Sequence, residues 1–170
     1  HGRHAAYGAS VGNLLEAAGF SVHREYYVND ASRQMDILGT SVWLRWLESN
    51  GVTAPFPTGG YRGDYIRDIV AEIDAASLKT PKLAAVLDGL PADAPKGDAD
   101  AFIDALTARA KELQGDEGFD HFRQQALESI RADIEDDLTE FGVVFDSWYS
   151  EQSLTKTRRI DDALDVLKKR

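Results

Sequence analysis

The chain has 170 residues, of which 43% are hydrophobic, so it contains enough apolar material for one domain or for a domain core with an insertion. Its formal net charge of −10 argues against generic nucleic-acid binding, which depends on the neutralisation of phosphates. The absence of cysteine excludes disulfides and thiolate sites, and no apolar stretch approaches the roughly 20 residues of a membrane span, so we predict a cytoplasmic protein without membrane attachment.

The first third of the chain predicts a helix, a strand and a second helix. Apolar residues at three-to-four spacing predict a helix over residues 3–18, which Gly19 ends. Residues 20–28 contain enough β-forming side chains to predict a strand, although their centre is half polar. A second apolar stripe predicts a helix over residues 32–49.

Two glycines lie four residues apart inside the first predicted helix. Gly8 and Gly12 each cost up to about 1 kcal/mol relative to alanine in a helix. We therefore expect a packing reason for them, because small residues at this spacing let a helix lie close to a sheet.

The middle of the chain predicts helices separated by irregular segments. Thr80 is a candidate helix cap with Pro81 at the first helical position. Proline and glycine clusters mark the irregular segments. The predicted elements are a loop at 51–60, a helix at 61–76, a short helix at 80–88 and a flexible linker at 89–98.

The last third predicts two helices, a strand and a closing helix. The longer of the two helices has strong helical periodicity in its aromatic and aliphatic residues. The predicted elements are helices at 98–114 and 116–141, a strand at 143–146, and a loop with a helix over 153–170. In the closing helix we expect four apolar residues to face inward: Ile160, Ala163, Leu164 and Leu167.

Two predicted strands are too few for a sheet that is stable by itself. Phosphate-binding turns of Rossmann-like folds lie between a strand and the helix that follows it. The first helix therefore needs a further strand before residue 1 for such a turn. We predict a mainly helical α/β chain: an incomplete Rossmann-like nucleotide-binding half with an α-helical insertion.

The residues at the start of the first helix are candidates for phosphate binding. A helix amino terminus attracts anions, and Gly2 would let the backbone approach a ligand closely. His1 can donate a hydrogen bond to phosphate oxygens as charge develops on them. The alternative is that His1 and Gly2 are a tag remnant or a frayed terminus.

A second candidate site follows the first predicted strand. Polar residues at the carboxyl end of a strand lie where open α/β sheets bind ligands, and Asn29, Asp30, Arg33 and Gln34 occupy this position. The alternative is that Asp30 caps the following helix and that Arg33 and Gln34 are solvated. The histidines follow no metal-ligand spacing, so we predict no metal site.

Five sequence segments occur in a fixed order along the chain: GRHAAYG at 2–8, REYYVNDASRQ at 24–34, SVWLR at 41–45, YRGDY at 61–65, and FGVVFDSW at 141–148 with Glu151, Ser153 and Leu154 after it. In this order and at these separations they resemble bacterial arginyl-tRNA synthetases. Each segment alone is a weak signal, whereas five collinear matches are specific. One departure is Ser32, which stands where that family usually has glycine.

The resemblance implies a site and a division of the chain. His1 resembles the last histidine of the family's His-x-Gly-His signature, which implies a catalytic His1 and an ATP site at His1 and Gly2. Asn29, Asp30, Arg33 and Gln34 would line or support the rim of the active site. Three parts are implied: residues 1–54 as a partial catalytic core, 55–141 as a helical connective insertion, and 142–170 as the return towards the core.

The resemblance also implies an enzyme, a class I aminoacyl-tRNA synthetase. A full enzyme would activate arginine with ATP, supplied with Mg²⁺, and transfer it to tRNA(Arg). We expect the 170 residues alone to be an inactive fragment without a tightly bound cofactor, which self-associates through exposed apolar surface. The alternative is an acidic helical protein-interaction module without a nucleotide site.

Overall fold

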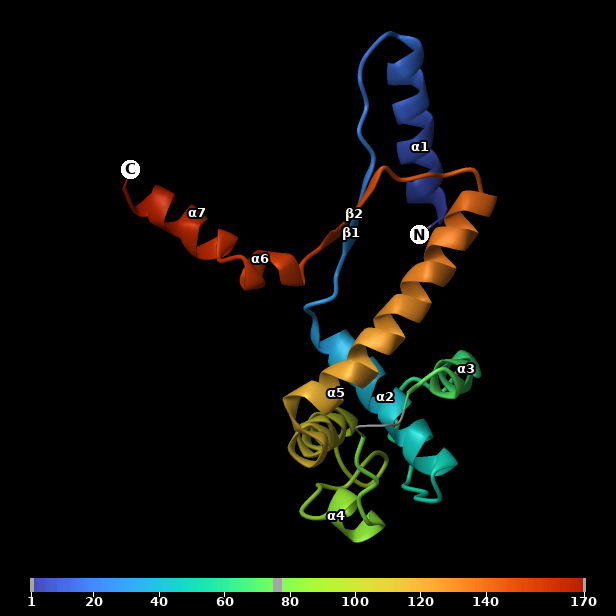
Figure 1. Ribbon diagram of the computed structural model, residues 1–170, viewed down its shortest axis with the longest axis vertical. Coiled ribbons are helices and arrows are strands. Elements are labelled where there is room, and N and C mark those ends of the chain that lie inside the picture. The colour runs from blue at the N-terminus through green and yellow to red at the C-terminus, as the bar shows by residue number, and fades with distance from the viewer. Residues whose placement is uncertain (1, 75–77, 170) are drawn as a thin grey trace. The chain divides into compact units, whose positions relative to one another are not determined.

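The computed structural model describes residues 2–74 and 78–169, and most of them are helical (Figure 1). Two compact units divide the chain: a strand unit, His1–Ala31 with Arg131–Arg170, and a core unit, Ser32–Ile130. The elements in chain order are α1 (Gly2–Ala17), β1 (Glu25–Val28), α2 (Arg33–Ser49), α3 (Tyr65–Ala71), α4 (Leu83–Leu87), α5 (Ala99–Glu140), β2 (Ser147–Ser150), α6 (Gln152–Lys156) and α7 (Arg159–Lys168).

Within the described residues, the strand unit contains one small sheet. Strands β1 and β2 lie side by side and run parallel, with Glu25 opposite Ser147 and Val28 opposite Ser150 (Figure 1). The chain is therefore mainly helical with a small parallel sheet, which confirms the coarse prediction of its fold class.

The second strand lies four residues later than the sequence predicts. Residues 143–146 are not a strand, because their polar groups form hydrogen bonds with the end of α5 and with the residue before β1. The amide of Val143 donates to the carbonyl of Leu138 (2.8 Å), which completes the end of α5. The carboxylate of Asp146 accepts from the amide of Arg24 (2.7 Å), so this amide bonds to a side chain and not to a backbone carbonyl of a neighbouring strand.

The first strand and the third and fourth helices are shorter than predicted. Strand β1 pairs over only four residues, because β2 is equally short. Helix α3 excludes Tyr61, whose amide donates to Ser41 Oγ (3.0 Å), and Arg62, whose guanidinium donates to two loop carbonyls. The end of the predicted helix 61–76 includes residues outside the described part of the chain. Helix α4 begins after Lys82, not at the expected cap.

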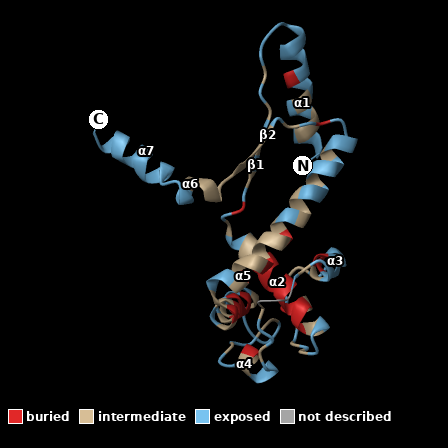
Figure 2. Cartoon of the chain, in the orientation of Figure 1, coloured by how far each residue is buried: buried red, intermediate tan, exposed pale blue. Residues whose placement is uncertain are grey.

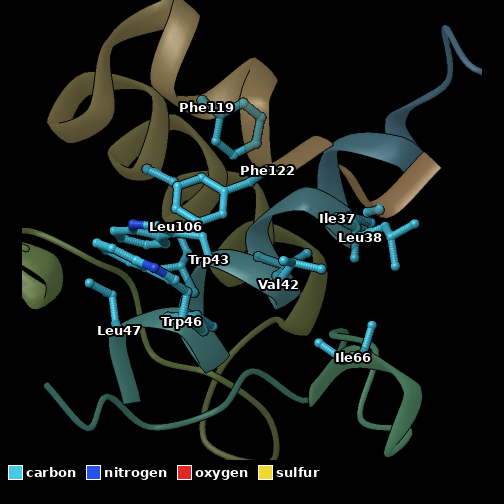
Figure 3. Packing of buried hydrophobic residues seen from close by; sticks show 14 of the residues in the cluster. Ile37, Leu38, Val42, Trp43, Trp46, Leu47, Ile66, Leu106, Phe119 and Phe122 are labelled. Carbon is cyan, nitrogen blue, oxygen red and sulfur yellow. The ribbon is translucent and has the colours of Figure 1, made fainter. Parts of the chain in front are cut away.

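The hydrophobic core lies in the core unit. Figure 2 shows buried residues concentrated on α2 and on the nearby part of α5. Trp43, Trp46 and Phe122 are among them, and the rings of Trp46 and Phe122 are 5.4 Å apart (Figure 3). Both tryptophans are thus core anchors. Every residue of the cluster lies between Ile37 and Ala126.

Helix α5 consists of two helices, as predicted, with the break at Gly115. This residue has φ 76° and ψ 169°, a conformation that strongly favours glycine. The part of α5 before Gly115 contributes Leu106 to the core, and the start of the part after it contributes Phe119 and Phe122. The break at Gly115 therefore bends the chain so that both segments contribute to one cluster.

The segment 89–98 contains no helix or strand, in agreement with the prediction that this segment is irregular. Asp93 anchors this segment to the loop 51–60, since the Asp93 carboxylate accepts from the amide (2.8 Å) and the hydroxyl (3.0 Å) of Thr58. Burial opposes ionisation there, but the hydrogen bonds from Thr58 and from the amide of Ala94 hold the pKa of Asp93 below its usual value.

The end of the chain differs from the single inward-facing helix that the pattern predicts. Two helices, α6 and α7, are separated by Arg158, which has φ 56° in the left-handed region. All of α7 is exposed in Figure 2. Ile160, Leu164 and Leu167 are 45%, 47% and 65% exposed, so the prediction that they face inward is wrong. Periodicity identified the apolar face but not a partner for it.

The location of the core predicts that two phenylalanines contribute differently to the free energy of unfolding. Phe122 is fully buried, so Phe122→Ala should lower the free energy of unfolding of the chain by about 3–5 kcal/mol. Phe141 is 61% exposed, and Phe141→Ala should change it by less than about 0.5 kcal/mol. Urea unfolding followed by circular dichroism measures both. Equal losses for the two variants would contradict the assignment of the core.

Candidate functional site

The carboxyl ends of β1 and β2 lie at the same edge, because the two strands are parallel. Asp30 follows β1 by two residues and is only 6% exposed. Its two carboxylate oxygens accept hydrogen bonds from Ser150 Oγ (2.5 Å) and from the amide of Gln152 (2.7 Å). Asp30 therefore joins the end of β1 to the end of β2. It does not cap α2, whose N-cap is Ser32.

Backbone hydrogen bonds complete this edge. The carbonyl of Val28 accepts from the amides of Asp30 and Glu151, each at 3.0 Å. Ser153 Oγ donates to the carbonyl of Ser150 (2.6 Å). The turn that leads from β2 into α6 is thus held by both its side chains and its backbone. Sequence patterns did not identify Ser150 and Gln152, although their position at the end of the second strand parallels that of Asp30 at the end of the first.

Aromatic side chains cover both faces of the strand pair. Tyr26 stacks on Trp148 at a centroid distance of 4.4 Å and meets the ring of Phe145 edge-on at 5.3 Å. On the alternate positions, Tyr27 stacks on Tyr149 at 6.3 Å. Partial burial raises the pKa of Tyr27, and the nearby carboxylate of Glu151 raises it further. The two stacked pairs, Tyr26 with Trp148 and Tyr27 with Tyr149, follow from the register, since each ring lies opposite its partner on the neighbouring strand.

Arg24 connects α1 to the segment before β1. Its guanidinium forms two bonds to the carboxylate of Glu16 (2.8 and 3.0 Å) and one to Asn13 Oδ1 (3.0 Å). The bond from Arg24 holds the pKa of Glu16 below its usual value. A Cβ atom at Gly12 would lie 3.0 Å from Arg24 Nη2, whereas one at Gly8 would meet nothing within 4 Å. The expected packing reason thus exists at Gly12 alone, and a side chain provides it, not the sheet.

His23, Ser147 and Asp146 form a group that has the composition of a nucleophilic triad but not its geometry. His23 Nε2 is 2.9 Å from Ser147 Oγ. Its Nδ1 is 3.9 Å from Asp146 Oδ2, too far for the hydrogen bond that orients the base in a triad. The His23 side chain is also 65% exposed. This arrangement does not activate Ser147 as a nucleophile.

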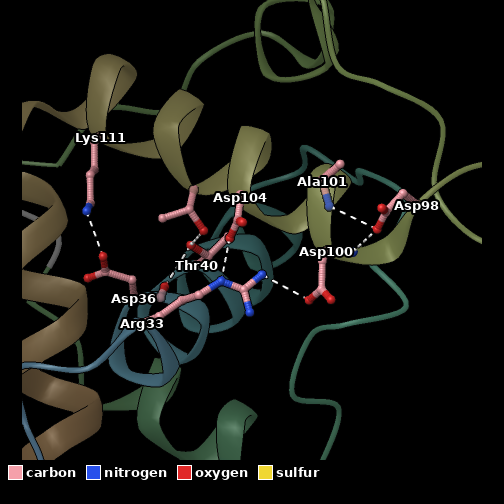
Figure 4. A network of polar contacts seen from close by, with 9 residues as sticks. Arg33, Asp36, Thr40, Asp98, Asp100, Ala101, Asp104 and Lys111 are labelled. Atoms are coloured by element: carbon pink, nitrogen blue, oxygen red, sulfur yellow. Dashed lines mark hydrogen bonds and ion pairs between the residues drawn. The ribbon is translucent and has the colours of Figure 1, made fainter.

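Arg33 and Gln34 belong to the core unit, where both have partners. Arg33 donates to Asp104 (2.7 Å) and Asp100 (3.0 Å) on α5, and these carboxylates raise its pKa (Figure 4). Gln34 Oε1 accepts from the hydroxyl of Tyr61 (2.6 Å). The two predicted rim residues thus join α2 to other segments of the core unit.

Further polar contacts join α2 to α5 beside Arg33. Asp36 pairs with Lys111 at 2.8 Å (Figure 4). The hydroxyls of Thr40 and Thr107 are 2.8 Å apart. A cavity of about 250 Å³ lies among these groups. Because the charged side chains that line it are paired with one another, the geometry favours a structural role for this network.

A larger cavity of about 700 Å³ lies in the strand unit. Its walls come from the start of α1, from β1, and from the end of α5, and most of its lining is apolar. Gly2 and His4 belong to this wall, so the predicted ATP-binding residue Gly2 borders a cavity at the start of a helix. The other predicted residue, His1, lies outside the described residues. Asn29, the remaining residue of the predicted rim, is exposed.

Two features are absent from the described residues. No three histidine, aspartate or glutamate side chains are grouped so that they would hold a metal ion. No helix in the part of the chain that the structure describes has the length and apolar character needed to cross a membrane.

The chain is similar along nearly its whole length to proteins named arginine–tRNA ligase. It is 56% identical over 171 residues to that of Thioalkalivibrio sulfidiphilus, 50% over 173 residues to that of Legionella pneumophila strain Paris, and 46% over 181 residues to that of Psychrobacter cryohalolentis. By sequence, the chain belongs to the arginyl-tRNA synthetase family. The matches cover 99%, 100% and 98% of this chain but 29% of the length of each relative.

No protein-family profile matches the chain, and no solved structure matches it. The family assignment therefore rests on the curated relatives, and it confirms the resemblance in the five segments. Two of these segments, residues 24–34 and 141–148, contain or border the two strands that pair in the structure. The resemblance to arginyl-tRNA synthetases thus includes β1, Asp30 and the first two residues of β2.

The two glycines of α1 provide a matched pair of substitutions. Gly8→Ala should raise the free energy of unfolding by up to about 1 kcal/mol, because alanine is the better helix former. Gly12→Ala should raise it less, since the new methyl group displaces the Arg24 guanidinium from Glu16 and Asn13. Urea unfolding measures the difference. In an Arg24→Ala background the two substitutions should have equal effects, and a persisting difference would contradict this explanation.

Proposed function

We propose that this chain is part of a longer arginine–tRNA ligase. The observation that carries this proposal is the 46–56% identity to proteins of that name along nearly the whole chain. Because the chain spans only 29% of their length, the complete activity belongs to the longer protein. ATP with Mg²⁺, arginine and tRNA(Arg) would be its substrates and partners.

The reaction has two steps. A carboxylate oxygen of arginine attacks the α-phosphorus of ATP, the bond to pyrophosphate breaks, and arginyl-adenylate forms. A hydroxyl at the 3′ end of tRNA then attacks the carbonyl carbon of the adenylate, and AMP leaves. Positioned hydrogen-bond donors stabilise the charge that develops on the phosphate in the first step. His1 and the backbone at Gly2 are our candidates for such donors.

The strand pair supports a Rossmann-like arrangement as a second part of the proposal. Strands β1 and β2 are parallel neighbours, yet the whole core unit lies between them in sequence. This is the connectivity expected if residues 1–54 and 142–170 are parts of a nucleotide-binding sheet and residues 55–141 are a connective insertion. Within the described residues, β1 pairs with β2 alone, so its other edge would accept a further strand of the longer protein.

Enzyme assays test the proposed activity. The full-length protein should catalyse arginine-dependent exchange of pyrophosphate into ATP and should arginylate tRNA(Arg). The 170-residue chain should catalyse neither reaction, because two paired strands leave the nucleotide-binding sheet incomplete. Exchange by the 170 residues would contradict the predicted inactivity. An inactive full-length protein would contradict the function itself and would favour the acidic interaction module.

Hydrogen exchange tests the proposed sheet. If another strand pairs with the second edge of β1, the amides of β1 should exchange more slowly in the full-length protein than in the 170-residue chain. The amides of α2 serve as the internal control, because α2 is packed in the core unit and should be equally protected in both proteins. Equal protection of β1 in the two proteins would contradict the Rossmann-like arrangement.

A further inference from the structure

Asp30 is a buried carboxylate of the strand unit, and it forms hydrogen bonds with two residues at the carboxyl end of β2. Its side chain receives one hydrogen bond from the Ser150 hydroxyl and one from the Gln152 amide. The residue is only 6% exposed, so it is enclosed among these groups. A substrate-binding carboxylate would need an oxygen directed to an open site, whereas both oxygens of Asp30 already accept from protein donors.

These two partners flank the turn between β2 and α6. Ser150 is the last residue of β2, and Gln152 is the first residue of α6. The amide of Glu151, between them, donates to the carbonyl of Val28 at 3.0 Å. Residues 150–152 are therefore each held by a group of the β1 end, and removal of the Asp30 carboxylate would release two of these three attachments at once.

We propose that Asp30 is a positioning residue that holds residues 150–152 at the carboxyl edge of the strand pair in the geometry that the ligase reaction requires. This inference rests on the proposed function. Open α/β sheets bind their substrates at the carboxyl edge of the strands. Displacement of a site by about 1 Å can lower a rate by about a hundredfold, so the attachment of this turn affects the chemical step.

The geometry predicts how substitutions at Asp30 differ. In Asp30→Asn, the amide oxygen still accepts from the Gln152 amide, and the amide nitrogen donates to the Ser150 hydroxyl, which is also an acceptor. In Asp30→Ala both attachments are lost, and the Gln152 amide is left without this acceptor. Ser150→Ala removes only one of the two. The expected loss of kcat is therefore largest for Asp30→Ala, smaller for Ser150→Ala and smallest for Asp30→Asn.

Steady-state pyrophosphate exchange by the full-length protein tests the proposal, at a temperature well below the melting temperature of every variant. Asp30→Ala should lower kcat by about 10- to 100-fold, while the KM for ATP changes much less. Asp30→Asn should stay within about threefold of the wild type. Asp133→Ala, which removes an exposed carboxylate of the same unit, should have wild-type kinetics. If Asp30 served stability alone, Asp30→Ala would lower the melting temperature, but the folded variant would keep the wild-type kcat.

Each result has one interpretation. Wild-type kcat in Asp30→Ala, or a loss in Asp30→Asn as large as that in Asp30→Ala, overturns the positioning role. The double variant Asp30→Ala with Ser150→Ala should lose little more activity than Asp30→Ala alone, because the shared attachment is already gone and only the long bond from the Ser153 amide to Ser150 Oγ (3.3 Å) is lost in addition. If Asp30→Ala does not fold, Ser150→Ala decides: a lowered kcat supports the role and an unchanged kcat overturns it. An inactive wild-type protein refutes the proposed function instead.

Discussion

The parallel pairing of β1 with β2 is the constraint on which the organisation of the chain depends. Parallel strands cannot be joined by a tight turn and need a crossover connection of a dozen residues or more. Here the connection contains the entire core unit. The pairing brings Asp30 to Ser150 and Tyr26 to Trp148, and it makes a shared carboxyl edge from segments that are distant in sequence.

The two units obtain their stability in different ways. The core unit contains the whole hydrophobic cluster, in which α2 packs its apolar side against α5. In the strand unit Val143 is the one buried hydrophobic residue among those described, so aromatic stacking and polar attachments contribute more there. A two-stranded sheet is marginal by itself in water. The exposed apolar residues of α1 and α7 belong to the same unit, and they fit our proposal of a longer protein.

The candidate site shows where reasoning from sequence succeeds and where it stops. The polar cluster after β1 was recognised because such clusters mark the carboxyl ends of strands. The pattern did not distinguish the roles of its members: Asp30 is buried against the end of β2, and Arg33 is paired with Asp100 and Asp104. The partners of these side chains are about 70 to 120 residues away, and no local pattern of spacing encodes contacts at that distance.

The sequence by itself determined the elements whose causes are local. It located α1 and α2 through apolar periodicity, and the break in α5 through Gly115, because helix formation depends on neighbours three and four residues apart. Only the tertiary structure decided the position of β2, the exposure of α7 and the packing of Arg24 on Gly12. A strand forms where a partner offers hydrogen bonds, and an apolar face is buried only where another surface meets it. Both conditions depend on residues far away along the chain.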